Sequence, residues 1–152
     1  MIEYCRPTLE DAKYLAEHLN KADKQEMTAS VGSHILDDII SGMEHSEQIG
    51  CCRIDGKPIA IFGIRKPSVL ADYGLIWLFL GEIDDSLRVY VALKTKRVVR
   101  AALQQYEYLY NYVDVGNEKI IRWLKFLGAE FYGPEPYGMY GAEHYRFEIR
   151  RK

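Results

Sequence analysis

The amino-acid sequence predicts one domain of mixed α/β class in which helices are segregated from strands. The chain has 152 residues, of which 48% are hydrophobic, and this is enough to bury one continuous core. Apolar residues alternate in several short stretches, as in strands, and repeat with helical spacing in others. No internal repeat or linker interrupts them. We therefore expect residues 1–152 to form a single domain.

The first third of the chain is predicted to hold a strand, two helices and a hairpin. Residues 2–6 ("IEYCR") alternate like a strand, and Thr8 can cap a helix after it. The apolar face expected for that helix consists of Leu9, Ala12, Leu15, Ala16 and Leu19. Residues 20–33 are polar and are expected to form a loop or a frayed helix, whereas residues 34–45 repeat with helical period. Asp55-Gly56 then separates two β-rich runs and predicts a two-stranded hairpin.

An uninterrupted apolar run, "YGLIWLFLGE" (residues 73–82), predicts a strand covered on both faces, as at the middle of a sheet. Asp84, Asp85 and Ser86 follow, and they suit the start of a helix because they supply caps and negative charge. This long helix is expected to bury Val91, Ala92, Val98, Val99, Ala102, Leu103 and Tyr106. Its first turns are rich in β-branched residues, so its start could lie several residues later.

The last third is predicted to alternate between strands and one short helix. Residues 108–115 ("YLYNYVDV") form a strand, and Asn117 is a suitable N-cap for a helix over residues 118–127. Gly128 is placed to end that helix. A strand, a Gly/Pro/Tyr-rich loop and a final strand are expected over residues 129–133, 133–141 and 144–150.

This order of elements resembles that of the GNAT acetyltransferases. In that superfamily a strand leads to an Asn that begins a short helix, and a Gly and an aromatic strand follow. Here "V-x-V-G-N-x-x-x-I-R-W-L-K-x-L-G-A-x-F" fills the pattern from Val113 to Phe131. More narrowly, residues 109–131 are similar to the corresponding stretch of the internal virion protein A family of short-tailed phages and of related GNAT-like phage proteins.

The resemblance implies a mixed, mostly antiparallel sheet with helices on both faces and two central parallel strands that splay apart. We expect residues 75–80 to be the central strand, with residues 108–113 beside it in parallel. In GNAT enzymes acetyl-CoA lies in the gap, and a helix N-terminus faces its pyrophosphate. If acetyl-CoA binds, the resemblance assigns its contacts to Leu78, Leu80, Gly81, Ser86 and Asn117.

The phosphate loop of the GNAT site is changed in this sequence. The superfamily has Arg/Gln-x-x-Gly-x-Gly/Ala between the central strand and the long helix, whereas this chain has "GEIDDSLR". One glycine, Gly81, remains, and three carboxylates stand where the pyrophosphate should lie: Glu82, Asp84 and Asp85. Like charges at that distance oppose anion binding. The sequence therefore predicts that no cofactor binds.

The usual tyrosine acid of the GNAT site is also missing, because Leu124 occupies its position. Tyr140 is the catalytic acid we nominate, with Tyr132 and Tyr137 as alternatives. Glu82 could act as a base, although helix capping is the simpler role for its carboxylate. Whether the chain is an enzyme stays open at this point.

Two functional hypotheses follow. The first is a phage-encoded GNAT-fold protein with a degenerate transferase site, which acts through protein contacts in virion assembly or infection. The second is an active acetyl-CoA-dependent N-acetyltransferase that acts on a host protein or a small amine. A nucleic-acid-binding module is disfavoured, because 20 Lys and Arg against 22 Asp and Glu give a net charge of only −2.

Phe126 breaks the pattern of the helix over residues 118–127. At about 100° per residue, the buried arc should hold Ile120, Trp123, Leu124 and Leu127. Phe126 falls instead on the exposed arc with Glu118, Lys119, Arg122 and Lys125. It is expected either to tuck under the loop over residues 133–141 or to belong to a docking patch for a protein partner. That patch would comprise Phe126, Tyr137, Met139 and Tyr140, rimmed by Lys119, Arg122 and Lys125.

The remaining polar residues predict no further site. Cys5, Cys51 and Cys52 form an odd set without metal-ligand spacing, so neither a disulfide framework nor a metal site is expected. Cys51 and Cys52 should point to opposite faces of a sheet, with one of them buried. His34, His45 and His144 are expected at the edges of elements. A solvated helix face is expected for Lys94, Lys96, Arg97 and Arg100.

The expected location follows from what the sequence lacks. The N-terminus has no secretory pattern, and the longest apolar runs are too short to span a bilayer. We therefore expect a protein of the host cytoplasm or the virion interior that is neither secreted nor bound to a membrane. Self-association into a homo-oligomer stays open.

Overall fold

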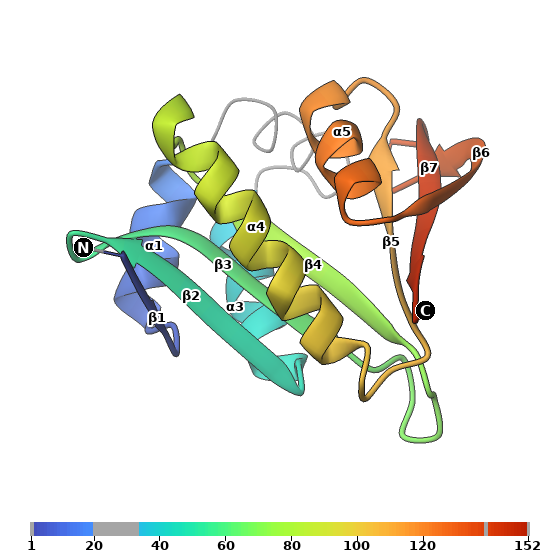
Figure 1. The fold of residues 1–152 in the computed structure, drawn as a ribbon, viewed down its shortest axis with the longest axis horizontal. Helices are drawn as coiled ribbons and strands as arrows, with labels where there is room; N and C mark the ends of the chain where they lie inside the picture. The colour runs from blue at the N-terminus through green and yellow to red at the C-terminus, as the bar shows by residue number, and fades with distance from the viewer. Residues whose placement is uncertain (1, 20–33, 139, 152) are drawn as a thin grey trace. The chain divides into compact units, whose positions relative to one another are not determined.

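A computed structural model of the chain describes residues 2–19, 34–138 and 140–151. Figure 1 shows the order of its elements along the chain. Two regions named above lie outside the described residues: the expected loop or frayed helix over residues 20–33, and Met139 of the expected docking patch.

The described residues form a mixed α+β fold, as the sequence predicted. The strands are β1 (Ile2–Cys5), β2 (Gln48–Ile54), β3 (Lys57–Arg65), β4 (Gly74–Leu80), β5 (Tyr108–Asp114), β6 (Glu130–Tyr137) and β7 (Ala142–Arg150). The helices are α1 (Leu9–Glu17), α3 (Ile35–His45), α4 (Asp85–Ala102) and α5 (Glu118–Phe126). The order of the strands by hydrogen bonding is β1-β2-β3-β4-β5-β7-β6. The predicted middle position of β4 is therefore confirmed.

Most of the strand pairs are antiparallel, and β4 with β5 is the parallel pair that the sequence predicted. Gly74 of β4 lies opposite Leu109 of β5, and Leu75 lies opposite Tyr110. Antiparallel pairing joins β1 to β2, β2 to β3, β5 to β7, and β6 to β7. The turn between β2 and β3 is the predicted Asp55-Gly56 pair, and both residues have positive φ (51° and 82°), as a two-residue hairpin requires.

The chain divides into two compact units. The first unit is Met1–Arg65 with Ile76–Glu82, and the second is Lys66–Leu75 with Ile83–Lys152. The boundary falls within β4, whose first two residues belong to the second unit. That residues 1–152 behave as a single domain stays a prediction.

The start of α1 in the first unit is held by a capping box. The backbone N–H of Asp11 donates to Thr8 Oγ1 (3.2 Å), and the backbone N–H of Thr8 donates to Asp11 Oδ2 (2.8 Å). Arg53 of β2 adds two hydrogen bonds to the same carboxylate, at 2.6 and 3.0 Å. Burial alone would raise the pKa of Asp11, but the hydrogen bonds from Arg53 and Thr8 outweigh it and lower that pKa.

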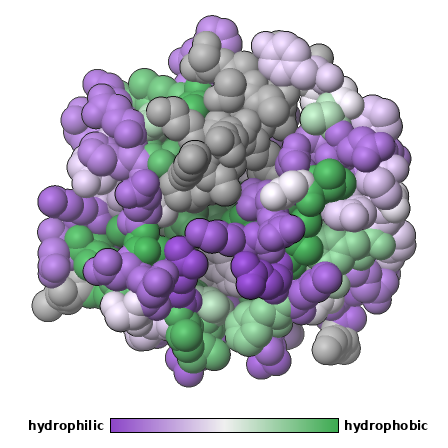
Figure 2. Space-filling model, turned by 90° about the horizontal axis from the view of Figure 1, so that it is seen from above, coloured by the Kyte–Doolittle hydropathy of each residue, from purple (hydrophilic) through white to green (hydrophobic). Residues whose placement is uncertain are grey.

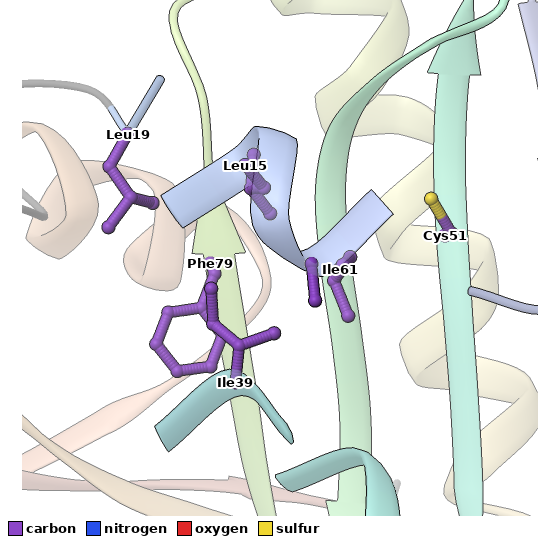
Figure 3. Packing of buried hydrophobic residues seen from close by; sticks show 7 residues of the cluster. Leu15, Leu19, Ile39, Cys51, Ile61 and Phe79 are labelled. Atoms are coloured by element: carbon purple, nitrogen blue, oxygen red, sulfur yellow. The ribbon is translucent and has the colours of Figure 1, made fainter. Parts of the chain in front are cut away.

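The apolar core of the first unit joins α1 and α3 to three strands (Figure 3). Its labelled members come from α1, α3, β2, β3 and β4, and Leu19 follows α1: Leu15, Leu19, Ile39, Cys51, Ile61 and Phe79. The face predicted for α1 is confirmed for Ala12 and Leu15, which are fully buried. Leu9 is half-exposed, because it occupies the first turn of the helix, so its predicted burial was wrong.

The prediction that one thiol of Cys51 and Cys52 would be exposed was wrong, because both are buried. Strand β2 lies between β1 and β3, and Tyr4 of β1 is the residue opposite Cys52. All three cysteines are free thiols. Burial raises the pKa of Cys51 to about 12, so this thiol is protonated and unreactive at neutral pH.

Helix α4 of the second unit begins at Asp85, so its β-branched residues do not delay its start. Val91, Val99 and Ala102 are buried, and the following Leu103 and Tyr106 are buried as well. Ala92 is half-buried. Val98 is partly exposed, which corrects the prediction, because a residue next to Val99 lies about 100° away from it around the helix.

The stretch predicted as a loop over residues 133–141 is largely strand. Strand β6 continues to Tyr137, and a register shift between Tyr132 and Glu135 accommodates Gly133 and Pro134. Because β6 is the last strand in the sheet order, proline there removes no ladder hydrogen bond that a neighbour needs. Gly133 has a φ of 99°, which favours glycine at the bulge.

Candidate functional site

The sequence placed a cofactor site at the end of β4, and Gly81 there has a structural role within the first unit. Its N–H donates to the carbonyl oxygen of Ile59 at 2.8 Å. A Cβ atom on Gly81 would lie 3.2 Å from the carbonyl oxygen of His18 and 3.4 Å from that of Ile59. A side chain at Gly81 would therefore be tight against two neighbouring backbone segments, and the N–H of Gly81 is already bonded. Leu78 and Leu80 are half-buried on β4.

The start of α4 is acidic and exposed. Glu82, Asp84, Asp85 and Ser86 are all exposed, and Asp84 occupies the N-cap position without a side-chain hydrogen bond to the helix. Glu82 lies two residues before the cap, so the capping role expected for it was wrong. Asp85 pairs with Arg88, with 3.0 Å between Oδ1 and Nε. These carboxylates are attracted by the positive end of the helix dipole, and they repel an anionic ligand at the same place.

The start of α5 has a different character. Asn117 caps the helix through Oδ1, which accepts from the backbone N–H of Ile120 at 3.5 Å, and its residue is only 6% exposed. Its Nδ2 is buried and makes no hydrogen bond to any described residue, and the same holds for Nε1 of Trp123. Buried amide donors are rarely left unpaired in proteins. Nδ2 of Asn117 is therefore a buried donor without an acceptor among the described residues.

The tyrosines nominated as acids occupy three different environments. Tyr140 is exposed and follows β6. Tyr132 donates from its hydroxyl to Glu130 Oε2 at 3.0 Å, and this hydrogen bond raises its pKa. Burial raises the pKa of Tyr137, whose ring stacks on Tyr112 with 4.0 Å between centroids. Leu124, at the usual acid position, is half-buried in α5.

The pattern predicted for α5 is confirmed for its polar arc. Glu118, Lys119, Arg122, Lys125 and Phe126 are exposed, whereas Ile120, Trp123, Leu124 and Leu127 are half-buried. Phe126 lies under Lys96 of α4, with 4.6 Å from Nζ to the ring centroid.

The aromatic members of the expected docking patch have separate neighbours in the described part of the chain. Tyr137 contacts the rings of Tyr112 and His144. The ring of Phe126 contacts Lys96 of α4. The ring contacts therefore do not join Phe126 to Tyr137.

One network was missed at the sequence level, and we call it the tyrosine–arginine face. It lies on β5 and β7 with Tyr73 before β4, and its members are Tyr73, Tyr108, Tyr110, Arg146, Glu148 and Arg150. Arg146 lies over the ring of Tyr110 (4.7 Å) and Arg150 over that of Tyr108 (4.6 Å). Glu148 accepts from both arginines. The sequence signal for this network was the appearance of tyrosine at every second position of residues 108–112 and of a charged residue at every second position of residues 146–150. Because its rings and charges satisfy one another, it stabilises the sheet and offers no open site.

His144 lies beside this face, and its predicted edge position was wrong. It is the third residue of β7 and is fully buried, with Nδ1 2.7 Å from the carbonyl oxygen of Ala142. His34 and His45 do lie at the two ends of α3. The ring of His144 contacts that of Tyr137 of β6, with 5.3 Å between centroids, and such a neighbour is not visible in a local sequence pattern.

The described residues hold no group of three or more His, Cys, Asp or Glu side chains placed to bind a metal ion. No helix in the same part of the chain is long and apolar enough to cross a membrane. Figure 2 shows one face of the molecule, on which hydrophobic side chains appear in separate groups among hydrophilic ones.

Comparison with solved structures shows that the fold is that of GNAT acetyltransferases. An N-acetyltransferase from Staphylococcus aureus Mu50 matches 100% of this chain and 99% of its own, with TM-score 0.75 and 15% identity. A GNAT-family acetyltransferase from Streptococcus pneumoniae matches over 100% of both chains, with TM-score 0.67 and 13% identity. The microcin C7 self-immunity acetyltransferase MccE, solved with acetyl-CoA and AMP, matches 98% of this chain and 92% of its own, with TM-score 0.72 and 13% identity.

Comparison at the sequence level gives a match to one family model over part of the chain. Residues 75–134 match a family model described as bacteriophage T7, probable scaffold protein Gp13. The matched stretch contains β4 except Gly74, then α4, β5, α5 and part of β6. Comparison with curated protein sequences gives no match.

Proposed function

We propose that this chain is a phage-encoded GNAT-fold protein, similar to internal virion protein A, which acts through protein contacts in virion assembly or infection and has a degenerate transferase site. The observation that carries the proposal is the acidic, exposed start of α4. The proposed setting is the host cytoplasm or the virion interior, with virion or host proteins or a second copy of the chain as partners.

The fit of acetyl-CoA can be judged from the residues where GNAT enzymes bind pyrophosphate. Glu82, Asp84 and Asp85 are all exposed there, and the N–H of Gly81 is bonded to Ile59. Two like charges 4 Å apart repel by about 1 kcal/mol in water and about 4 kcal/mol near a protein surface. The residues at this end of α4 therefore do not fit the phosphates of acetyl-CoA, and we derive no chemical step through that cofactor.

The phage setting is supported by the family model that matches residues 75–134, since its description names a probable scaffold protein. A scaffold works by binding other proteins, and this agrees with a role that does not need the transferase site. The stretch that matches includes α5 with its exposed basic residues and Phe126.

The alternative function is an active acetyl-CoA-dependent N-acetyltransferase that acts on a host protein or a small amine. It is favoured by one observation, the buried Nδ2 of Asn117 without a described partner. In this alternative Glu82 and Tyr140 are the catalytic base and acid, and Leu78, Leu80, Gly81, Ser86 and Asn117 contact the cofactor.

Thermal unfolding with acetyl-CoA tests the proposal. A ligand present at a hundredfold its dissociation constant stabilises a protein by about 2.7 kcal/mol and visibly raises its melting temperature. We expect almost no shift at millimolar acetyl-CoA. A saturable shift that is lost in Asn117→Ala would instead establish the enzyme alternative.

A charge-removal variant isolates the cause. Replacing Glu82, Asp84 and Asp85 together by Gln, Asn and Asn removes the repulsion while it keeps the side-chain shapes. A shift with acetyl-CoA in this variant, but not in the wild type, is the expected result if carboxylates alone exclude the phosphates. The same absence of a shift in both proteins would mean that the site is closed for a further reason.

A further inference from the structure

Charge is distributed unevenly between two helices and the rest of the chain. Together α4 and α5 contain eight Lys and Arg residues but only two acidic residues, a net charge of +6, whereas the whole chain has −2. One of the two acidic residues, Asp85, is paired with Arg88. The net excess of positive charge makes these two helices strongly basic in a chain that is otherwise acidic.

Helix α4 also exposes apolar side chains along one line. Val89, Leu93, Lys96 and Arg100 follow one another at spacings of four, three and four residues, which places them within a narrow arc of the helix. Val89 is 69% exposed and Leu93 is 52% exposed. The buried residues Val91 and Val99 occupy other positions around the helix, so the buried side of α4 does not include Val89 or Leu93.

The row of residues on α4 contacts a similar row of basic and apolar residues on α5. Lys96 lies over the ring of Phe126, which is 43% exposed. Arg122 and Lys119 precede Phe126 by four and seven residues and therefore share its side of α5. We call the combined area the α4–α5 surface, and its members are Val89, Leu93, Lys96, Arg100, Lys119, Arg122 and Phe126.

We propose that the α4–α5 surface binds an acidic amphipathic helix of a partner protein, an inference that rests on the proposed role in protein contacts. The basic residues match carboxylates on both sides of such a helix, and Val89, Leu93 and Phe126 receive its apolar side chains. Val89 to Arg100 spans about 16 Å at 1.5 Å per residue, which is the length of three helical turns.

The apolar residues decide between an acidic helix and other anions. A nucleic-acid backbone pairs with Lys and Arg but gives nothing to pack on exposed valine and leucine side chains. An acidic amphipathic helix satisfies both parts of the surface at once. Apolar anchors surrounded by charged residues are the usual composition of a protein docking site.

Fluorescence anisotropy with a labelled synthetic peptide tests the proposal. The probe is an 18-residue helix with Leu and Phe on one face and Glu on the others. We expect saturable binding with a dissociation constant below about 100 µM in low salt, and at least about tenfold weaker binding in 0.5 M salt, because screening shortens the reach of the charges. The first control has the same composition in scrambled order, and the second has Lys in place of Glu; both should bind at least about tenfold more weakly.

Two variants and one matched control locate the binding to the surface. Leu93→Asp and Phe126→Asp should each weaken binding of the amphipathic peptide by at least about tenfold. Leu70→Asp is the control, because Leu70 is 95% exposed and belongs to neither α4 nor α5. Its binding should equal that of the wild type. Circular dichroism melting of all three variants verifies that they fold.

Three results would overturn the inference. They are no binding of the amphipathic peptide, equal binding of the scrambled peptide, and stronger binding of single-stranded DNA or of anionic vesicles that Leu93→Asp leaves unchanged. The last result would assign the surface to a nucleic acid or a membrane. Each of these results would rule out an acidic helix as the partner but would leave the proposed degenerate site standing, because the acetyl-CoA measurement tests that site separately.

Discussion

Leu15 on α1 and Leu93 on α4 are both leucines in the interior of a helix, but Leu15 is fully buried and Leu93 is half-exposed. The contrast extends to whole helices. In the first unit, α1 and α3 bury Leu15 and Ile39 completely, whereas α5 in the second unit has no fully buried residue. Leu15 and Ile39 thus contribute to the core of the first unit, whereas α4 and α5 of the second unit keep Leu93 and Phe126 at the surface.

The largest expected effect separates these two leucines directly. Leu15→Ala should lower the free energy of unfolding by about 2–5 kcal/mol, because it leaves a cavity in a packed core. Leu93→Ala, the matched control, should change it by no more than about 0.5 kcal/mol. Urea unfolding measures both. An equal loss in the two variants would mean that the outer side of α4 is covered in the folded protein, and the contrast would fail.

The next effect compares two ion pairs, one in each unit. Asp11 is buried and forms an ion pair with Arg53, while Asp85 is exposed and forms an ion pair with Arg88. Asp11→Asn should reduce the free energy of unfolding by about 3 kcal/mol, because it removes the carboxylate that accepts from Arg53 and Thr8 and leaves Arg53, among the described residues, only its longer pair with Glu3 (3.5 Å). Asp85→Asn should have little effect, as is usual for exposed pairs. Denaturant midpoints of the two variants check this order.

A smaller effect concerns pH. The pKa of Asp11 is lowered from its ordinary value of 3.8, so the unfolded chain takes up this proton before the folded one does. The stabilisation by Asp11 is therefore complete above pH 3.8 and declines as the pH falls through the lowered pKa. The difference in urea midpoint between wild type and Asp11→Asn should be constant from pH 7 to 5 and should shrink below pH 4. A difference that grows toward low pH would contradict the assigned sign.

The smallest expected effect on stability is at the surface of the second unit. Phe126→Asp should leave the melting temperature nearly unchanged, because Phe126 is partly exposed and its described ring contact is with a lysine. The same variant should abolish self-association or co-purification with virion components. A large loss of stability would show that Phe126 belongs to the core, and the docking role would then be dropped.

Local rules predicted much of the fold. Asp55-Gly56 defines its hairpin because both residues tolerate positive φ, and Thr8 and Asn117 cap their helices through their own side chains. These features depend on a few neighbouring residues. The extension of β6 over Gly133 and Pro134 does not, since it requires β7 beside it and an edge position in the sheet. Pairing across the sheet overrode the turn preference of those residues.

The candidate site divides in the same way. The exposed carboxylates before and within the first turn of α4 and the exposed position of Phe126 followed from spacing alone. Spacing did not predict that the N–H of Gly81 is bonded or that Nδ2 of Asn117 has no partner among the described residues. Whether each of these groups is bonded depends on residues far away in the sequence. Burial of Cys52 and His144 was missed for the same reason, as flanking strands decide it.

Trp77 has a consequence for how folding can be observed. Its indole N–H donates to Ser46 Oγ at 2.7 Å, and a Cβ on Gly63 would lie 2.5 Å from its ring, so any loosening of the first unit changes the surroundings of this chromophore. The other tryptophan of the chain, Trp123, belongs to the second unit. Each unit therefore has its own fluorescent reporter. In each of the variants Trp123→Phe and Trp77→Phe, the fluorescence melting curve should coincide with that variant's own circular dichroism curve if residues 1–152 unfold as one domain, and two separate transitions would mark two.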